Sequence, residues 1–373
     1  MKKILYVVNK IDGRGGLNRI AFDKINYLVN YYQIDVLYYG SRNARPFYEV
    51  DERVRFHNIE INAFSSFYKK ITNTVYVYFK YKKILKEINP DIIINLNSNI
   101  LSWIIPFVKK DIPKIIELHQ SYDGVIIYND NAFGKGSLKS KFLMGLRKYI
   151  YPLYQKVIVL TNTDKKKWGF KNTEVIPNFT NIKSDSIKKD NKQYFLWVGR
   201  LSHQKGIDLL IKIWDKFTLN NSNWNLILIG KSSNTVSDLN KEFLKFINGI
   251  HKDRIDYIEE TTDIINYYNK SSIYLSTSRY EGLPLCLIEA STMGKPIIGF
   301  NITGNDEVIV NNVNGILVDP GNIDNYVKAM IDLSNNETKL IQFSNESLKR
   351  SQLFNKDYIM KKWIELINNL TNN

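Results

Sequence analysis

Short apolar segments alternate with longer segments of helical periodicity along the whole chain. In the first half, runs rich in Ile, Val, Leu and Tyr predict strands at residues 2–8, 34–40, 91–97, 114–119 and 156–161. In the second half, similar runs predict strands at residues 194–199, 224–230, 255–260, 271–277 and 296–300. Most of these runs do not alternate apolar with polar residues, as is typical of parallel strands that helices cover on both faces. The order of elements therefore predicts two successive doubly wound α/β domains.

A polar segment without hydrophobic period separates the two halves. It spans residues 179–193 and follows Pro177, which is typical of a linker. We therefore expect a first domain at residues 1–183 and a second domain at residues 184–373. The last segment, residues 356–370, spaces its apolar residues on one helical face, and it could pack against either domain.

The composition is that of a globular protein without membrane spans. The chain has 373 residues, of which 44% are hydrophobic and 24% charged. Its longest apolar stretch, residues 92–107, is interrupted by Asn95 and by the polar residues 97–99, so no transmembrane helix is expected. The first residues lack a cleavage site of the secretory kind. A single cysteine, Cys286, excludes an internal disulfide and fits a reducing cytoplasm.

The net charge of +15 is confined to one half of the chain. Residues 1–183 hold 30 Lys and Arg against 15 Asp and Glu, whereas residues 184–373 hold 22 of each kind. This asymmetry indicates that the first half meets an anionic surface, either nucleic acid or membrane headgroups. The alternative is a basic surface that is only solvated.

Two segments of the basic half, residues 64–86 and 134–156, mix lysines with aromatic residues. Aromatic rings sit at headgroup level in a bilayer while ammonium groups meet anionic lipid, so we favour peripheral contact with the inner face of the cell membrane. Such surfaces also bind single-stranded nucleic acid. No nucleic-acid-binding module matches the sequence, however, so no nucleic acid partner is expected. If the aromatic residues face the core, only solvated lysines remain.

Two loops have the composition of phosphate-binding turns. The turn GRGGLNR, residues 13–19, follows the first strand, but Asn18 breaks the dinucleotide-binding fingerprint at its third glycine. The turn GRLSHQKG, residues 199–206, places Arg200 and Lys205 at the carboxyl end of a strand, where two cations could neutralise a diphosphate. Tight turns and solvated loop charges are the simpler readings. No Asp-x-Asp pair occurs in the sequence, so no metal site is expected.

The segment STSRYEGLPLCLIEA, residues 276–290, carries the strongest chemical signal. We expect Glu281 in a turn after a strand, Pro284 at the first position of a helix and Glu289 in the second turn of that helix. Backbone N–H groups at Leu283, Leu285 and Cys286 would then face an anion. The two carboxylates could accept hydrogen bonds from sugar or ribose hydroxyls. A capping role for Glu281 and a helix-dipole role for Glu289 are the alternatives.

Together these motifs resemble those of the GT-B glycosyltransferases, specifically the retaining glycosyltransferase family 4 group. The resemblance extends over the whole chain and includes the GG-x-x-R turn, the strand-end His119 and the sequence VIPN at 175–178. It implies an α/β GT-B fold of two Rossmann-like doubly wound domains facing a central cleft. The first domain would bind the acceptor and the second the nucleotide-sugar donor. Asn18 departs from the family pattern, because many members have glutamate there.

The resemblance also implies roles for individual residues. Arg200 and Lys205 would bind the donor diphosphate, and Glu281 would act as a catalytic residue at the transferred sugar. His119, the only one of four histidines to end an apolar strand, would lie near sugar and acceptor, although a structural role is also open. The remaining donor contacts would come from Gly16, Ile258, Gly282, Leu283, Pro284, Leu285 and Glu289, and acceptor contacts from Arg19 and Asn97.

The chemistry implied is transfer of a hexose or N-acetylhexosamine with retained anomeric configuration, in bacterial surface polysaccharide synthesis. The donor would be a nucleoside diphosphate sugar, with UDP favoured, and the acceptor a glycan or lipid-linked sugar. No cofactor or metal is expected. A sugar-nucleotide epimerase or phosphorylase of the same fold, and a non-catalytic protein that binds membrane or nucleic acid, are the alternatives.

Overall fold

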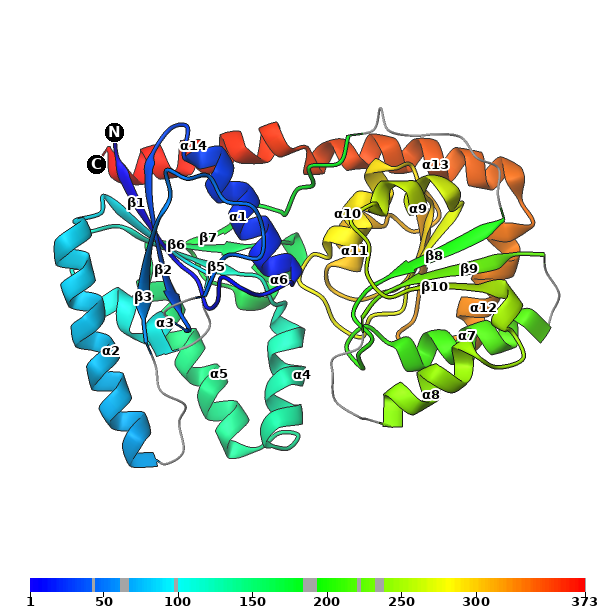
Figure 1. Ribbon diagram of the computed structural model, residues 1–373, viewed down its shortest axis with the longest axis horizontal. Coiled ribbons are helices and arrows are strands. Elements are labelled where there is room, and N and C mark those ends of the chain that lie inside the picture. Colours follow the sequence, from blue (N-terminus) through cyan, green and yellow to red (C-terminus); the bar gives the residue numbers. More distant parts are fainter. Residues whose placement is uncertain are drawn as a thin grey trace. The chain divides into compact units, whose positions relative to one another are not determined.

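A computed structural model describes residues 1–41, 44–60, 67–96, 100–183, 193–219, 223–231 and 238–372, with the backbone alone at 67–73 and 238. The chain divides into two compact units, Met1–Asn178 with Asp357–Asn373, and Phe179–Lys356 (Figure 1). The sequence had suggested a boundary between residues 183 and 184, and had left open the partner of the last helix. The structure begins the second unit at Phe179 and assigns the last helix to the first unit.

The first unit is built on a parallel sheet with strand order β3-β2-β1-β4-β5-β6-β7. Its strands are β1 (Lys3–Val7), β2 (Gln33–Tyr39), β3 (Arg55–Ile59), β4 (Ile92–Asn95), β5 (Lys114–Leu118), β6 (Lys156–Val159) and β7 (Thr173–Val175). Its helices are α1 (Gly16–Leu28), α2 (Phe67–Ile88), α3 (Ile100–Ile104), α4 (Tyr122–Phe133), α5 (Leu138–Ile150), α6 (Asn162–Trp168) and α14 (Lys356–Thr371).

The second unit repeats the architecture with strand order β10-β9-β8-β11-β12-β13. Its strands are β8 (Tyr194–Val198), β9 (Asn225–Ile229), β10 (Ile255–Ile258), β11 (Ile273–Ser276), β12 (Ile297–Phe300) and β13 (Gly315–Val318). Its helices are α7 (Ile207–Leu219), α8 (Asp238–Ile247), α9 (Ile264–Lys270), α10 (Leu285–Thr292), α11 (Asn305–Val308), α12 (Ile323–Ser334) and α13 (Glu337–Ser351).

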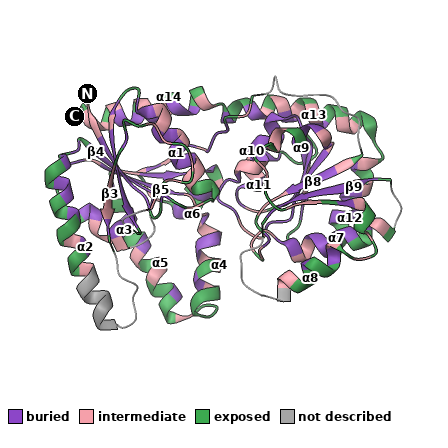
Figure 2. Ribbon diagram, in the orientation of Figure 1, coloured by how far each residue is buried: buried purple, intermediate pink, exposed green. Residues whose placement is uncertain are grey.

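The strands at the centre of each sheet are buried on both faces, as Figure 2 shows by their purple colour. In β1 the four residues from Ile4 to Val7 have no exposed surface, and Leu226, Ile227 and Leu228 of β9 are equally buried. Helices therefore cover both sides of each sheet, which explains why the apolar runs in the sequence do not alternate.

Within the described residues, three strands were not predicted from the sequence, and all three lie at sheet edges. They are β3 with the sequence RFHNI, β7 with TEV and β13 with GILV. An edge strand pairs on one side only, and these are short or partly polar. The ten strands that the sequence did predict are present in the structure and include every interior strand of both sheets.

Helix α14 packs its apolar face on the first unit. Ile359, Trp363 and Leu366 are buried. At its end, the Tyr32 hydroxyl donates to Asn368 Oδ1 over 3.0 Å, and Lys2 Nζ donates to Thr371 Oγ1 over 2.7 Å. The chain thus returns to its N-terminal strand after completing the second unit. No helix within the described residues combines the length and the apolar character that spanning a bilayer requires.

Each sheet has a point where the strand order reverses, between β1 and β4 in the first and between β8 and β11 in the second. Loops that leave the carboxyl ends of such neighbouring strands turn to opposite faces of the sheet and leave room for a ligand between them. The loop after β1 contains the GRGG sequence. The loop after β8 contains the GRLSHQKG turn with Arg200 and Lys205, and the loop after β11 contains residues 281–284, the EGLP turn. The sheet order therefore brings these two motifs together.

Candidate active site

Lys205 and Glu281 form an ion pair at the switch point of the second sheet. Lys205 lies in the turn between β8 and α7, and Glu281 lies in the turn between β11 and α10. The distance from Lys205 Nζ to Glu281 Oε1 is 2.6 Å. The hydroxyl of Ser278 donates to the same carboxylate oxygen over 2.8 Å. Two motifs that are 76 residues apart in sequence thus meet in one site.

A close backbone approach fixes the turn that carries Lys205. Gly206 has a φ of +66°, and a Cβ atom on it would lie 2.0 Å from the carbonyl oxygen of Thr277. The Thr277 hydroxyl donates to the Lys205 carbonyl over 2.9 Å, and the Trp197 indole donates to that hydroxyl over 3.0 Å. Only glycine fits at position 206, because any side chain would push the Lys205 turn away from β11.

The Lys205–Glu281 pair is largely shielded from solvent, with 17% and 9% of the side chains exposed. Burial by itself would lower the pKa of Lys205, but the adjacent Glu281 carboxylate outweighs it and raises that pKa above its ordinary value. Lys205 therefore stays charged at neutral pH. Arg200, the second predicted cation, is exposed and lies 3.4 Å from Gln204 Oε1. An exposed cation and a largely buried one thus lie on the same turn.

The EGLP turn leads directly into α10. Pro284 is the N-cap of this helix and Leu285 its first residue, so the prediction that Pro284 opens the helix was wrong by one position. The turn packs on a second loop, since a Cβ atom on Gly304 would lie 2.4 Å from the Gly282 carbonyl oxygen. The first amide groups of a helix have no intrahelical acceptor, so the start of α10 favours an anion beside Glu281.

Glu289 lies in the second turn of α10, as expected, and is 4% exposed. The hydroxyl of Tyr268, on α9, is 3.1 Å from Glu289 Oε2. Burial raises the pKa of Cys286, and the nearby carboxylates of Glu281 and Glu289 act in the same direction. Ile258 ends β10, where its carbonyl accepts a hydrogen bond from Gly230 over 3.0 Å. The predicted donor residues of the second unit therefore lie at the carboxyl ends of β8, β10 and β11 or in the segments that follow these strands.

In the first unit, the GRGG turn ends at α1, with Gly15 as N-cap and Gly16 as first residue. Arg19 lies in the first turn of this helix. Asn18, the departure from the family pattern, donates through Nδ2 to the carbonyls of Lys10 and Gly13 over 2.9 and 3.1 Å. The amide thus holds the loop closed, which a glutamate at this position could not do in its ionised form because a carboxylate has no donor.

His119 directly follows β5, and its Nε2 lies 3.0 Å from Glu117 Oε2. Glu117 also forms an ion pair with Lys24 of α1, and both of these side chains are almost fully buried. Burial lowers the pKa of His119, although Glu117 opposes this effect. Sequence reasoning missed Lys24 and Glu117. The available signal was a charged residue inside the apolar strand sequence KIIELH, because a buried charge needs a partner.

Asn97, a predicted acceptor residue, lies outside the described residues. Among the residues that the structure describes, no group of three or more His, Cys, Asp or Glu side chains is placed to hold a metal ion. The described part of the site therefore consists of cations, carboxylates and helix amides in the second unit. Gly16, Arg19 and His119 belong to the first unit.

Two family models cover most of the chain. Residues 14–184 match the model for Glycosyltransferase Family 4, and residues 178–350 match the model for Glycosyl transferases group 1. An uncharacterized glycosyltransferase of Haemophilus influenzae is 30% identical over 376 residues and covers 98% of each chain. A Campylobacter jejuni α-1,4-N-acetyl-D-galactosaminyltransferase, which is named for a diphosphoundecaprenol-linked acceptor, is 23% identical over the full length of both chains.

Solved structures show the same fold. Sucrose-phosphate synthase from Thermosynechococcus elongatus superposes with a TM-score of 0.79 at 17% identity and covers 99% of each chain. The Anabaena protein HepE, in complex with UDP and glucose, superposes with a TM-score of 0.76 at 17% identity and covers 99% of this chain and 100% of that one. With two doubly wound units and family matches over both of them, the chain belongs to the glycosyltransferases of family 4 and has the GT-B fold.

Proposed function

We propose that this glycosyltransferase moves a hexose or N-acetylhexosamine from a UDP-sugar to a glycan or lipid-linked acceptor, with retention of anomeric configuration, in bacterial surface polysaccharide synthesis. The observation that carries the donor assignment is the Lys205–Glu281 pair at the switch point of the second sheet. A fixed cation next to a carboxylate matches a ligand in which a diphosphate is bonded to a sugar. The UDP and glucose bound by HepE support UDP as the nucleotide.

In the proposed reaction, Lys205, Arg200 and the amides at the start of α10 hold the diphosphate. The bond between the anomeric carbon and the diphosphate oxygen breaks, and a bond to the acceptor oxygen forms on the same face of the sugar. The acceptor proton passes to the departing diphosphate. Lys205 and Arg200 stabilise the charge that develops on this leaving group, and Glu281 accepts hydrogen bonds from the sugar hydroxyls. Glu289 would hold the ribose, Ile258 would contact the base, and His119 would contact the sugar and acceptor.

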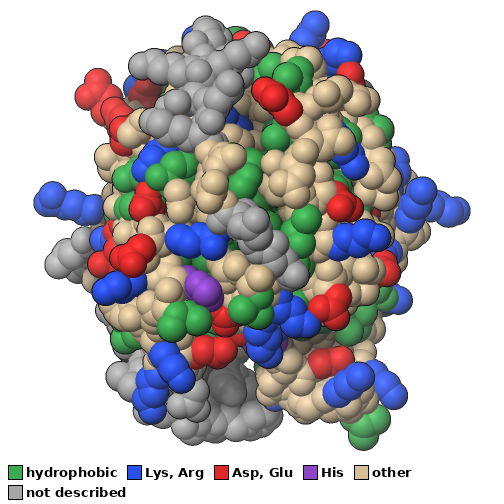
Figure 3. Space-filling model, turned by 90° about the vertical axis from the view of Figure 1, so that its right-hand side faces the viewer, with side chains coloured by type: hydrophobic (Ala, Val, Ile, Leu, Met, Phe, Trp, Pro, Cys, Tyr) green, Lys and Arg blue, Asp and Glu red, His purple; other side chains and the backbone are tan. Residues whose placement is uncertain are grey.

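The acceptor assignment rests on charge. The first unit contains 31 Lys and Arg against 17 Asp and Glu, whereas the second contains 21 against 20. The face in Figure 3, on the side of β8–β10 and α12, accordingly mixes basic and acidic side chains without a large field of either sign. We therefore assign the acceptor to the basic first unit and propose a cytoplasmic location with peripheral contact to the inner face of the membrane. The lipid-linked acceptor in the name of the Campylobacter relative supports this assignment.

The test is a thermal-shift panel of UDP, GDP and ADP, followed by mass spectrometry of products formed from the matching sugar nucleotides. We expect stabilisation by UDP and a product that is one sugar heavier than the acceptor. Conversion of the donor to an isomer without an acceptor would instead support an epimerase. Binding to acceptor-bearing membranes without nucleotide binding would support a non-catalytic role.

Metal removal is expected to leave the transfer rate unchanged, because Lys205 and Arg200 supply the positive charge that a divalent cation would otherwise bring to the diphosphate. Initial rates measured with excess EDTA, and with Mg²⁺ or Mn²⁺ restored, check this expectation. A rate that falls with EDTA and returns with metal would contradict it.

A further inference from the structure

Helix α5 presents an apolar stripe to solvent. Leu138, Phe142 and Tyr149 are 86%, 67% and 69% exposed, which is unusual for large apolar side chains on one element. Together with Gly145 they are spaced by four, three and four residues, so they follow one side of the helix. The buried residues of the helix are Ser140, Arg147 and Ile150, and Met144 and Leu146 pack beside them on the core of the unit. The large apolar side chains of the stripe therefore face away from that core.

Lysines flank this stripe. Lys141 and Lys148, seven residues apart, lie along one edge, and Lys139 lies on the other; all three are exposed. No Asp or Glu occurs in residues 131–163, which contain six Lys and Arg. An apolar stripe bordered by cations, without any acid, matches a bilayer interface with anionic headgroups, because rings enter the headgroup level while ammonium groups meet phosphate.

Neighbouring elements extend the same surface. Helices α4 and α5 extend side by side away from the sheet (Figure 1), and Ser140 Oγ of α5 donates to Asp130 Oδ1 of α4 over 3.1 Å. Tyr128 of α4 is 58% exposed, and Phe133 at its end lies under Lys139, whose Nζ is 4.2 Å from the ring centroid. In Figure 2 both helices carry green, exposed residues, which in α4 lie in its second half. Helix α4 thus adds exposed aromatic side chains beside the basic and apolar face of α5.

We propose that the outer face of α5 lies on the surface of an anionic phospholipid bilayer, with Leu138, Phe142 and Tyr149 in the headgroup layer. This inference deepens the proposed peripheral contact and rests on it, but it does not depend on the transfer reaction.

The experiment is co-sedimentation of the full chain with vesicles of phosphatidylcholine alone or with added phosphatidylglycerol. We expect binding to the anionic vesicles that weakens with salt. The Phe142→Ser/Tyr149→Ser variant should bind on the order of tenfold more weakly. Replacing Lys141 and Lys148 by Gln should weaken binding about 30-fold, from about 1 kcal/mol for each basic residue at the surface.

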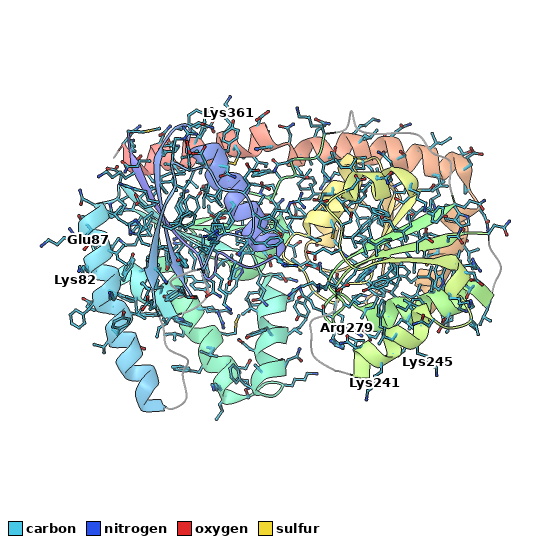
Figure 4. The ribbon with its side chains drawn as sticks, in the orientation of Figure 1. Lys82, Glu87, Lys241, Lys245, Arg279 and Lys361 are labelled. Atoms are coloured by element: carbon cyan, nitrogen blue, oxygen red, sulfur yellow. The ribbon has the colours of Figure 1, made fainter. Side chains whose placement is uncertain are left out.

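The matched control is α8 of the second unit, where Leu244 is 56% exposed and Lys241 and Lys245 point away from the helix (Figure 4). The Leu244→Ser/Lys241→Gln/Lys245→Gln variant should bind vesicles like the unmodified chain. Equal binding by the α5 variants, equal binding to neutral vesicles, or no binding at all would overturn the proposal. UDP affinity, measured on the same variants, shows that they fold and separates this result from the donor assignment.

The buried ion pair beside His119 carries a second, independent inference. Both Lys24 Nζ and His119 Nε2 lie within hydrogen-bonding distance of Glu117 Oε2. Burial raises the pKa of Glu117, but Lys24 and His119 together hold it below its ordinary value. An ionised carboxylate only accepts hydrogen bonds, so His119 Nε2 must carry the hydrogen and Nδ1 is left as an acceptor.

We infer that Glu117 is a positioning residue, which holds His119 in the tautomer that accepts a hydrogen bond from a hydroxyl at Nδ1. Lys24 keeps the carboxylate in place from α1, and its Nζ lies 4.5 Å from the ring centroid of Trp363 on α14. The neutral His119 ring carries one N–H hydrogen, at Nε2, and this hydrogen is donated to Glu117. A substrate group that meets His119 Nδ1 must then be a donor, such as a sugar hydroxyl.

The test is two-dimensional ¹H–¹⁵N NMR of the histidine rings. The chain has four histidines, and the His119→Gln variant identifies the signals of this one. We expect the Nε2–H tautomer of His119 in the unmodified chain and a mixture of both tautomers in the Glu117→Gln/Lys24→Met variant. Both substitutions are made together so that no buried charge is left without its partner. The kcat of this variant should fall on the order of tenfold at unchanged UDP affinity. An Nδ1–H tautomer, or a tautomer unaffected by the substitutions, would overturn the inference, and the NMR measurement does not require that the acceptor be known.

Discussion

The Glu281→Gln variant should lose about 100- to 1000-fold in kcat, the range observed when one group that stabilises a transition state is removed. Glutamine keeps the shape of the side chain, and its amide oxygen still accepts hydrogen bonds from Lys205 and Ser278, so the turn should stay intact. What disappears is the negative charge beside the transferred sugar. Initial rates of transfer from the donor that stabilises the protein measure the effect.

UDP affinity should stay equal or rise in this variant, because the negative charge next to the diphosphate is lost while Lys205 remains. The Glu346→Gln variant is the matched control, since Glu346 forms an exposed pair with Lys349 on α13 with an N–O distance of 2.6 Å. It should transfer sugar at the original rate. Transfer by Glu281→Gln within a few-fold of that rate would remove Glu281 from the proposed chemistry.

The Lys205→Met variant is expected to bind UDP about 10- to 150-fold more weakly, which corresponds to the loss of one charge-assisted hydrogen bond of about 1.5–3 kcal/mol. Uridine, which has no phosphate, should bind equally to both proteins. Isothermal titration of UDP and uridine into the variant measures the difference. The Lys245→Met variant on α8 removes an equivalent charge from an outward-pointing side chain (Figure 4) and should leave both affinities unchanged.

Removing Lys205 leaves the largely buried Glu281 without its cation, and this alone could destabilise the turn. The Lys205→Met/Glu281→Gln variant removes both charges and separates folding from phosphate binding. It should melt near the unmodified chain and still bind UDP weakly. Tight UDP binding by a folded double variant would show that the diphosphate lies elsewhere.

Much of the second unit could be predicted from sequence because its signals are local. A buried parallel strand produces an apolar run in the sequence. The short segment EGLPLCLIEA by itself predicts that Glu281 lies in a turn and Glu289 in the helix that follows. Within the described residues, three of the four edge strands were missed because they are short or partly polar, whereas the fourth, β10, was predicted from its apolar residues. The predicted helical position of Pro284 was off by one residue, because a sequence pattern places the end of a helix only to within one or two residues.

The sequence by itself determined the two doubly wound halves, the residues that end their central strands and the confinement of the basic charge to the first half. Only the tertiary structure decided which of these residues meet. The strand order makes β8 and β11 neighbours and so pairs Lys205 with Glu281. The packing of α1 on β5 buries Lys24 against Glu117 beside His119, and α14 joins the first unit. These are contacts between segments far apart in the chain, and local periodicity contains no information about them.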